Sequence, residues 1–365
     1  MQPSHETRRA LKYFWRCYCL LSQQISLCIE EKQKCRGVEF LEFTDPEACQ
    51  AAVKGSDVKL LPTKRGSFHA EITQIGMNKL WMQRFKVALP QISTIAVTSK
   101  RKHIGFLLET SHSSLHHCGL EVSRNDIVVG GLDELHQRSE ERFHYGTMSL
   151  PMDELFALHR TIVGRDLLDK PQIKMARPNL EAMSRLRKLH DVIGQLANAA
   201  PDLLANPEVV RALEQQLLHV MIRCLAESAG VESTAGTQQH NVIVARFHQF
   251  LEANPDRAIY LAEICQSVGA SERTLRTACE EQFGMGPIRY LTLRRMHLVH
   301  RALLRADASS ATVTSIATGH GFWELGRFSV AYRALFGELP SETLRRPMQE
   351  TEVPFHLPSR LSVVR

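Results

Sequence analysis

The strongest constraint on the fold of this 365-residue chain is a pattern in its last third that occurs twice. In residues 261–283, apolar residues at helical spacing lead to a break at Gly269, and Ser271 is placed to cap a second amphipathic helix. Residues 313–336 repeat the short helix, the glycine turn at Gly319 and Gly321, and the second apolar face. A helix, a tight turn and a second helix form a helix-turn-helix. Because internal repetition rarely arises by chance, the pattern predicts two such units.

The segment between the two copies, Pro287 to Arg305, reads as one connecting helix. It contains no glycine, and its proline stands in the first turn, where a missing N–H is tolerated. At about 1.5 Å per residue its nineteen residues span about 28 Å, close to the roughly 34 Å between successive major grooves on one face of B-DNA. The spacing predicts that the second helices of the two units read two adjacent major grooves.

Candidate base-reading side chains lie on the solvent-facing positions of the first unit's second helix. They are Arg273, Thr274, Arg276 and Thr277. Arginine can bond guanine with two hydrogen bonds, and threonine offers a hydroxyl and a methyl to base edges. An ordinary solvated helix face is the alternative for this unit taken alone.

In the second unit, the side chains of the stretch GFWELGRFS, Gly321 to Ser329, are expected to be divided between the core face and the face that would meet DNA. Its phenylalanines and leucine are expected in the small helical core. Trp323 is expected to cap or wedge the start of the helix, with a contact to the DNA sugar-phosphate backbone as the alternative. Glu324 and Arg327 are one turn apart on the face that would meet DNA, where they could also pair with each other.

The net charge of the chain is compatible with a polyanionic partner but does not require one. The whole chain has a formal net charge of +6, and residues 240–346 hold thirteen arginines, no lysine and ten acidic residues. Arginines such as Arg294 on the connecting segment are candidate phosphate contacts, with structural ion pairs as the alternative.

The N-terminal half predicts an α+β chain. From 38 to 150, short runs of β-branched and aromatic residues between turn residues predict a β-sandwich or barrel. From 151 to 228, apolar residues at helical spacing predict helices at Met152–Val163, Leu180–Ala197 and Pro207–Ala226. The last two could dimerise or pack on the β-rich region, and both alternatives stay open. A polar stretch at 229–239 reads as a flexible linker.

Both ends of the chain are expected to be loose, at 1–37 and 347–365. Leu11 to Ile29 is interrupted by Lys12 and Arg16, so neither a membrane span nor a signal peptide is expected there, and a cytoplasmic, nucleoid-associated protein with reduced thiols is expected. The cysteines near the start lack the CxxC pairs of a zinc site. They are Cys17, Cys19, Cys28 and Cys35.

At this point the sequence resembles the DNA-binding region of the AraC/XylS family of bacterial transcription regulators, from about Asn241 to Arg346. The resemblance is carried by LAEICQSVGASERTLR, by FGMGPIRYLTLRRM, by the helix Val313 to Ala317, by the pair Gly321-Phe322 and by FGELPSETLR. It implies two helix-turn-helix units on promoter DNA near RNA polymerase. It also implies an N-terminal module, for which a cupin-like barrel at 38–150 fits, that senses a small molecule, forms a homodimer, or does both.

The resemblance carries over to individual positions. Arg273, Arg276 and Thr277 match the family's base-reading positions in the first unit, and Gly326, Arg327 and Val330 match those in the second. Two positions depart from the pattern: Cys279 replaces a large aromatic core residue, and Gly326 removes a reading side chain.

Two alternative functions are weighed. A cupin-type metal enzyme needs clustered ligands, but no HxH followed closely by glutamate is present, so the histidines are expected on the surface or in loops. They are His112, His116, His117, His136 and His144. A cysteine-based DNA-repair regulator needs paired reactive cysteines, which the N-terminal cysteines do not form. No catalytic residue, metal or cofactor is therefore expected.

A sensing module needs an apolar cavity with a few polar groups. Trp81, Arg84, Phe106 and Tyr145 are the candidate ligand-binding residues, with core or surface packing as the alternative, and Arg84 would suit a carboxylate. The sequence as a whole predicts a ligand-responsive transcription regulator that is not an enzyme. The effector, the operator and the choice between activation and repression stay open.

Overall fold

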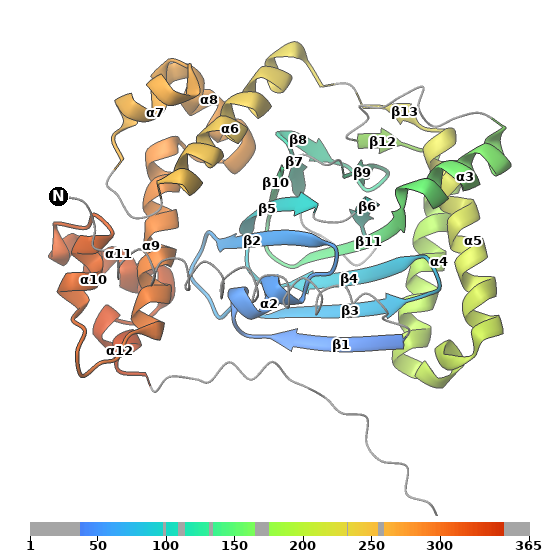
Figure 1. Cartoon of the computed structure of the whole chain (residues 1–365), viewed down its shortest axis with the longest axis horizontal. Coiled ribbons are helices and arrows are strands. Elements are labelled where there is room, and N and C mark those ends of the chain that lie inside the picture. The colour runs from blue at the N-terminus through green and yellow to red at the C-terminus, as the bar shows by residue number, and fades with distance from the viewer. Residues whose placement is uncertain are drawn as a thin grey trace, which may run out of the picture.

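The structure, a computed structural model, describes residues 37–97, 100–108, 114–130, 134–164, 175–231, 233–254 and 259–346. The loose ends expected at 1–37 and 347–365 therefore lie outside the described residues except for Gly37, as do His112 and the four cysteines near the start. Two antiparallel sheets form the middle of the molecule, with one group of helices on each side (Figure 1).

The β region, residues 37–151, supplies most of both sheets, whose strand pairs are all antiparallel. The first sheet runs, in spatial order, β1 (Gly37–Phe43), β3 (Ala70–Gly76), β4 (Trp81–Val87), β11 (Phe143–Pro151), β6 (Arg101–Leu107), β9 (Ile127–Val129), β12 (Met175–Arg177) and β13 (Ala229–Gly230). The second runs β2 (Ser56–Pro62), β5 (Gln91–Val97), β10 (Leu135–Ser139), β7 (Leu115–His117) and β8 (Leu120–Val122). A short helix, α2 (Pro46–Ala52), joins β1 to β2. The predicted β-rich region, a sandwich or barrel, is confirmed as antiparallel sheets.

A second group of helices covers the outer face of the first sheet (Figure 1). They are α3 (Met152–Val163), α4 (Leu180–Ala199), the 3-10 turn η2 (Pro201–Ala205) and α5 (Pro207–Ala226). Asn179 and Asn206 cap α4 and α5 by accepting backbone hydrogen bonds, as helix N-caps do. Met183, Ile193 and Leu217 pack in one core with sheet residues such as Phe106. The apolar faces of α4 and α5 are therefore used against the sheet. No described helix is long and apolar enough to cross a bilayer.

The C-terminal helices, residues 235–346, pack on the opposite side, against the second sheet (Figure 1). They are α6 (Ala235–Ala253), α7 (Leu261–Val268), α8 (Glu272–Phe283), α9 (Pro287–Arg305), α10 (Val313–Gly319), α11 (Leu325–Phe336) and α12 (Pro340–Leu344). Thr234 caps α6, so that helix starts inside the stretch 229–239, and the expectation of a flexible linker there is wrong from residue 235 onward. The helix starts earlier than predicted because the Thr234 side chain accepts a hydrogen bond from the Thr237 backbone N–H. The sequence pattern did not identify this cap.

Two small cores build the two helix-turn-helix units. One is made by α6 to α9 and the other by α9 to α12, so α9 belongs to both. Gly269 and Gly321 have φ angles of 72° and 81°, the left-handed conformation that glycine adopts without steric cost, and each lies in the turn of its unit. Ser271 caps α8 as predicted. Cys279 is fully buried in the first core, where Phe283 stacks on Tyr290 with ring centroids 4.2 Å apart.

Candidate functional site

The exposed face of α8 presents the residues predicted to read bases. Arg273, Arg276 and Thr277 are exposed. Thr274 is half-buried, and it is hydrogen-bonded to the capping Ser271. Arg276 pairs with Glu272 at 3.1 Å across one helical turn, which leaves the guanidinium in solvent and able to exchange partners. The Thr277 hydroxyl donates to the Arg273 carbonyl at 3.0 Å, so its oxygen and its methyl remain for a base edge.

The corresponding face of α11 is also open. Arg327 is 85% exposed and pairs with Glu324 at 2.8 Å, the pairing that the sequence allowed. A Cβ at Gly326 would meet no atom within 4 Å, so no packing contact requires this glycine. The glycine leaves a flat patch on which a DNA backbone could approach the helix closely.

Two large apolar side chains stand exposed on the same unit. Trp323 is 74% exposed and Val330 is 72% exposed, while Phe322 and Phe328 pack together in the unit's core with ring centroids 4.9 Å apart. The aromatic residues of Gly321 to Ser329 are thus divided between core and surface. Trp323 does not wedge the helix start as expected, because Glu324 is the N-cap and the indole lies in solvent. The exposed indole leaves the alternative for Trp323, a contact with the DNA sugar-phosphate backbone, as a prediction.

Arg294 is placed differently from the other predicted DNA contacts. Its side chain is only 16% exposed and donates to Glu252 at 3.1 Å and to the Leu251 carbonyl at 3.5 Å. Further along α9, Arg301 and Arg305 pair with Glu47 of α2 at 3.1 Å and 2.6 Å. The arginines on this side of α9 therefore form structural ion pairs, the alternative to phosphate contacts. Arg294 could contact a DNA phosphate only if its pair with Glu252 broke.

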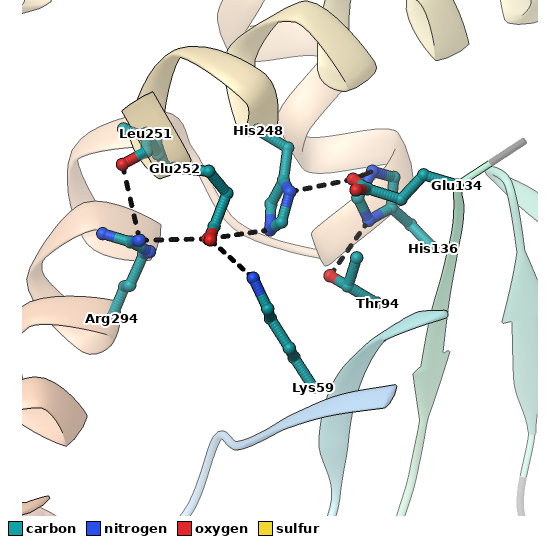
Figure 2. Close-up of polar contacts among 8 residues, drawn as sticks. All are labelled: Lys59, Thr94, Glu134, His136, His248, Leu251, Glu252 and Arg294. Atoms are coloured by element: carbon teal, nitrogen blue, oxygen red, sulfur yellow. Dashed lines mark hydrogen bonds and ion pairs between the residues drawn. The ribbon is translucent and has the colours of Figure 1, made fainter. Parts of the chain in front are cut away.

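An interface cluster of polar residues joins the β region to the C-terminal helices (Figure 2). Glu252 of α6 accepts from Lys59 of β2 at 2.5 Å and from Arg294 of α9 at 3.1 Å. His248 of α6 lies 2.8 Å from Glu134, which precedes β10. Burial alone would raise the pKa of Glu252, but its hydrogen bonds and the charges of Lys59 and Arg294 outweigh burial and hold that pKa below its ordinary value. The carboxylate is therefore ionised at neutral pH and links three elements.

His136 of β10 is buried at the centre of this interface. Its ring lies edge-on to His248 and Phe283, with centroids 5.3 Å and 5.4 Å away, and its Nδ1 is 3.3 Å from the Thr94 hydroxyl. The expectation that the histidines lie on the surface or in loops is wrong for His136 and His117, which are buried in strands. His136 packs there as a neutral ring, because its pKa is lowered to about 4. Among the residues that the structure describes, no three His, Cys, Asp or Glu side chains are grouped so as to hold a metal ion.

Acid should weaken this interface. Burial and the neighbouring His248 lower the pKa of His136 to about 4, although Glu134 acts in the opposite direction. An unfolded histidine titrates near pH 6.5, so between about pH 6.5 and 4 the unfolded chain binds more protons and stability falls as the pH falls. For His136 alone we expect a loss of about 2 kcal/mol between pH 7 and 5. Urea unfolding at both pH values measures it, and the same loss in His136→Gln would contradict the assignment.

A cavity of about 120 Å³ lies inside the β region. Alternate residues of the second sheet line it, as the two-residue period of a strand requires. They are Ser56, Val58 and Leu60 of β2, Gln91, Ser93, Ile95 and Val97 of β5, and Leu135 and Gln137 of β10. The remaining lining comes mainly from β4, β6 and β11 of the first sheet. The cavity thus lies between the two sheets.

The intervening residues of the same strands face the C-terminal helices. Lys59 of β2 pairs with Glu252, Ile92 of β5 packs in the core of α6 to α9, and His136 of β10 contacts Phe283. We call β2, β5 and β10 the shared wall, because one face bounds the cavity and the other bears the helices. A change of shape on the cavity side therefore acts directly on the strands that hold α6, α8 and α9.

The structure does not bring the four predicted ligand residues together. Tyr145 lines the cavity, whereas Phe106 is fully buried on the helix side of its sheet, edge-on to His190 at 5.0 Å. Arg84 pairs with Asp191 at 2.6 Å and borders a separate hollow of about 280 Å³, and Trp81 lies under the Arg101 guanidinium at 3.9 Å. Only Tyr145 of the four is positioned to touch a molecule in the 120 Å³ cavity.

The helix-turn-helix domain family matches residues 264–346. "XylDLEGF operon transcriptional activator 2" of Pseudomonas putida is 36% identical over 112 residues, which are 31% of this chain and 71% of that protein. "Probable thc operon regulatory protein" of Rhodococcus erythropolis is 40% identical over 96 residues, 26% of this chain and 29% of the relative. The chain thus covers most of the first relative but under a third of the second.

A solved structure of a probable AraC family transcriptional regulator from Rhodopseudomonas palustris is 34% identical and covers 29% of this chain and 98% of its own. Its TM-score is 0.27, too low to add to the argument. The assignment rests instead on two helix-turn-helix units joined by α9 and on the identity to the Pseudomonas activator across most of its length. The chain belongs to the AraC/XylS family of transcription regulators.

Proposed function

We propose that this protein is a sequence-specific DNA-binding transcription regulator that reads two adjacent major grooves and responds to a small molecule held in the β region. The observation that carries the DNA part is the pair of open faces on α8 and α11. Arg276 pairs there with Glu272 and Arg327 with Glu324, and both pairs are exposed. Such pairs cost little to exchange for a base or a phosphate.

The shared wall supports the response to a small molecule. It places the cavity and the C-terminal helices on opposite faces of the same three strands, so occupancy of the cavity changes the surface on which α6, α8 and α9 rest. A tightly packed interior transmits a small displacement rather than absorbing it. The effector therefore needs no direct contact with DNA or with the reading helices.

The same proposal covers the partners. The relatives are operon activators and regulatory proteins, and we extend that role to this chain as activation at promoter DNA beside RNA polymerase, in the cytoplasm and without catalytic activity. A homodimer is part of the proposal. Val192 of α4 supports it, because this large apolar side chain is 53% exposed on the helix layer.

Selection of bound duplexes from a random library tests the DNA part. We expect the full chain to enrich two blocks of preferred bases centred about 10 to 10.5 base pairs apart, one for each unit. Affinity for the enriched duplex should fall steeply with salt, because arginines displace condensed counterions. A single enriched block would remove one unit from the proposal, and equal affinity for random DNA would remove sequence-specific reading altogether.

A further inference from the structure

Two buried hydrogen-bond acceptors line the cavity without a partner among the described residues, His103 Nε2 and Gln91 Oε1. Two other amide side chains of the lining are engaged. The Gln83 side-chain amide accepts a hydrogen bond from the Lys54 backbone N–H and donates one to the Lys54 carbonyl. The Gln137 side chain donates to His117 at 3.2 Å. A buried acceptor without a partner carries the full desolvation cost of a polar group, so a bound molecule that donates to it is stabilised.

The two acceptors lie at opposite ends of the cavity. Gln91 pairs with Pro62 at one end of the β2–β5 ladder, and Ser56 pairs with Val97 at the other. The His103 ring is hydrogen-bonded to the backbone of Gly55, which precedes Ser56 in the chain. Six strand residues span about 20 Å, so a small ligand reaches one acceptor and not both.

His103 is the better-prepared acceptor. The bond to Gly55 occupies its other ring nitrogen, which orients the ring and leaves the lone pair on Nε2. Burial, together with the charges of Arg101 and Lys102, lowers the pKa of His103 to about 4, so the ring is neutral at pH 7 and accepts a hydrogen bond. The Gln91 amide can rotate to find other partners and is less constrained.

The size of the cavity limits the ligand. A dry cavity of about 150 Å³ lined by aliphatic and aromatic side chains accommodates benzene. This cavity holds about 120 Å³, and the surface that it presents is almost wholly apolar. The space is therefore that of one ring or an equally small branched molecule.

The charges at the cavity argue against an anion. Of the described residues that line it, the basic ones are Lys54 and His103. Lys54 is paired with Glu39 at 3.0 Å, and His103 is neutral. A carboxylate moved from water into such a space would lose its hydration without gaining an unengaged cation, which is strongly unfavourable.

We propose that the effector is an uncharged, largely apolar molecule of about one ring that donates one hydrogen bond to His103 Nε2. This inference rests on the proposed function, because it takes the cavity between the sheets as the effector site. His103 then distinguishes a hydroxylated ligand from a hydrocarbon of the same shape.

Three probes with the same carbon skeleton test the proposal on the full chain by titration calorimetry at pH 7.5: benzyl alcohol, toluene and benzoate. We expect benzyl alcohol to bind at least about 100-fold more tightly than benzoate. His103→Leu should weaken benzyl alcohol by about tenfold or more, since its hydroxyl is then buried unpaired, and should leave toluene within about threefold. Gln91→Leu removes the other open acceptor, at the far end of the cavity, and should weaken benzyl alcohol less than His103→Leu does.

A second measurement does not depend on a folded variant. The ¹⁵N resonance of His103 Nε2 in the wild-type protein should move when benzyl alcohol is added and stay in place with toluene. Benzoate binding as tightly as the alcohol, an unmoved His103 resonance, or no binding of any probe would overturn the proposal. None of these experiments uses DNA. Such a result would therefore leave the DNA-binding part of the proposed function to be decided separately by the DNA selection.

Discussion

Phe283→Ala is expected to lower the free energy of unfolding by about 3 to 5 kcal/mol. Phe283 is 1% exposed, stacks on Tyr290 at 4.2 Å and meets His136 edge-on at 5.4 Å. It therefore belongs both to the core of the first helix-turn-helix unit and to the contact with the shared wall. Truncation leaves a cavity at this junction, and the neighbouring rings can close it only in part.

Urea unfolding of the full chain measures this loss, and DNA binding measured in parallel should weaken as α8 becomes less ordered. Trp323→Ala is the matched aromatic control for the unfolding measurement only, because Trp323 is itself a candidate DNA contact. Its side chain is 74% exposed, so stability should change by less than about 0.5 kcal/mol. A loss below about 1 kcal/mol in Phe283→Ala would mean that the junction is not a packed core.

Arg276→Ala is expected to weaken binding to the selected operator by about 1 to 3 kcal/mol and to relax the preference at one base position. The guanidinium is exposed on α8, and its pair with Glu272 is a surface contact that contributes little to stability. Arg327→Ala on α11 should produce a similar loss at a position in the other block. Neither variant should shift the unfolding midpoint measurably.

Competition binding with single-base variants of the operator checks both arginines. Arg211→Ala is a matched control, because Arg211 lies on α5 and makes an exposed pair with Glu208 at 3.3 Å, three residues away, as Arg327 does with Glu324. Operator binding should be unchanged in the control. Unaltered specific binding in both Arg276→Ala and Arg327→Ala would show that the groove assignment is wrong.

The helical half of the chain was predictable because its signals are local. Ser271 caps α8, Pro287 opens α9, and Gly269 adopts the left-handed conformation that ends α7. Each signal acts within one turn of helix, so it can be recognised without knowledge of the rest of the fold. The start of α6 was predicted wrongly, because its cap Thr234 stands in a stretch of small polar residues that resembles a linker.

The faces of the sheets were not predictable in the same way. Phe106 and Tyr145 are both large aromatic residues of the kind that line ligand cavities. The structure buries Phe106 against α4, whereas Tyr145 lines the cavity. In a strand, neighbouring residues point to opposite faces, and both faces of these sheets are covered. An alternating pattern cannot then tell which covered face encloses a ligand.

The sequence by itself determined two helix-turn-helix units, their joining helix and the exposed residues that would read DNA, because helix periods, caps and glycine turns act over a few residues. Only the tertiary structure decided that Arg294 pairs with Glu252, that His136 is buried between two layers, and that the shared wall separates the cavity from the reading helices. Those features depend on contacts between residues far apart in the chain. No local pattern specifies them, since they arise only when the sheets and helices pack together.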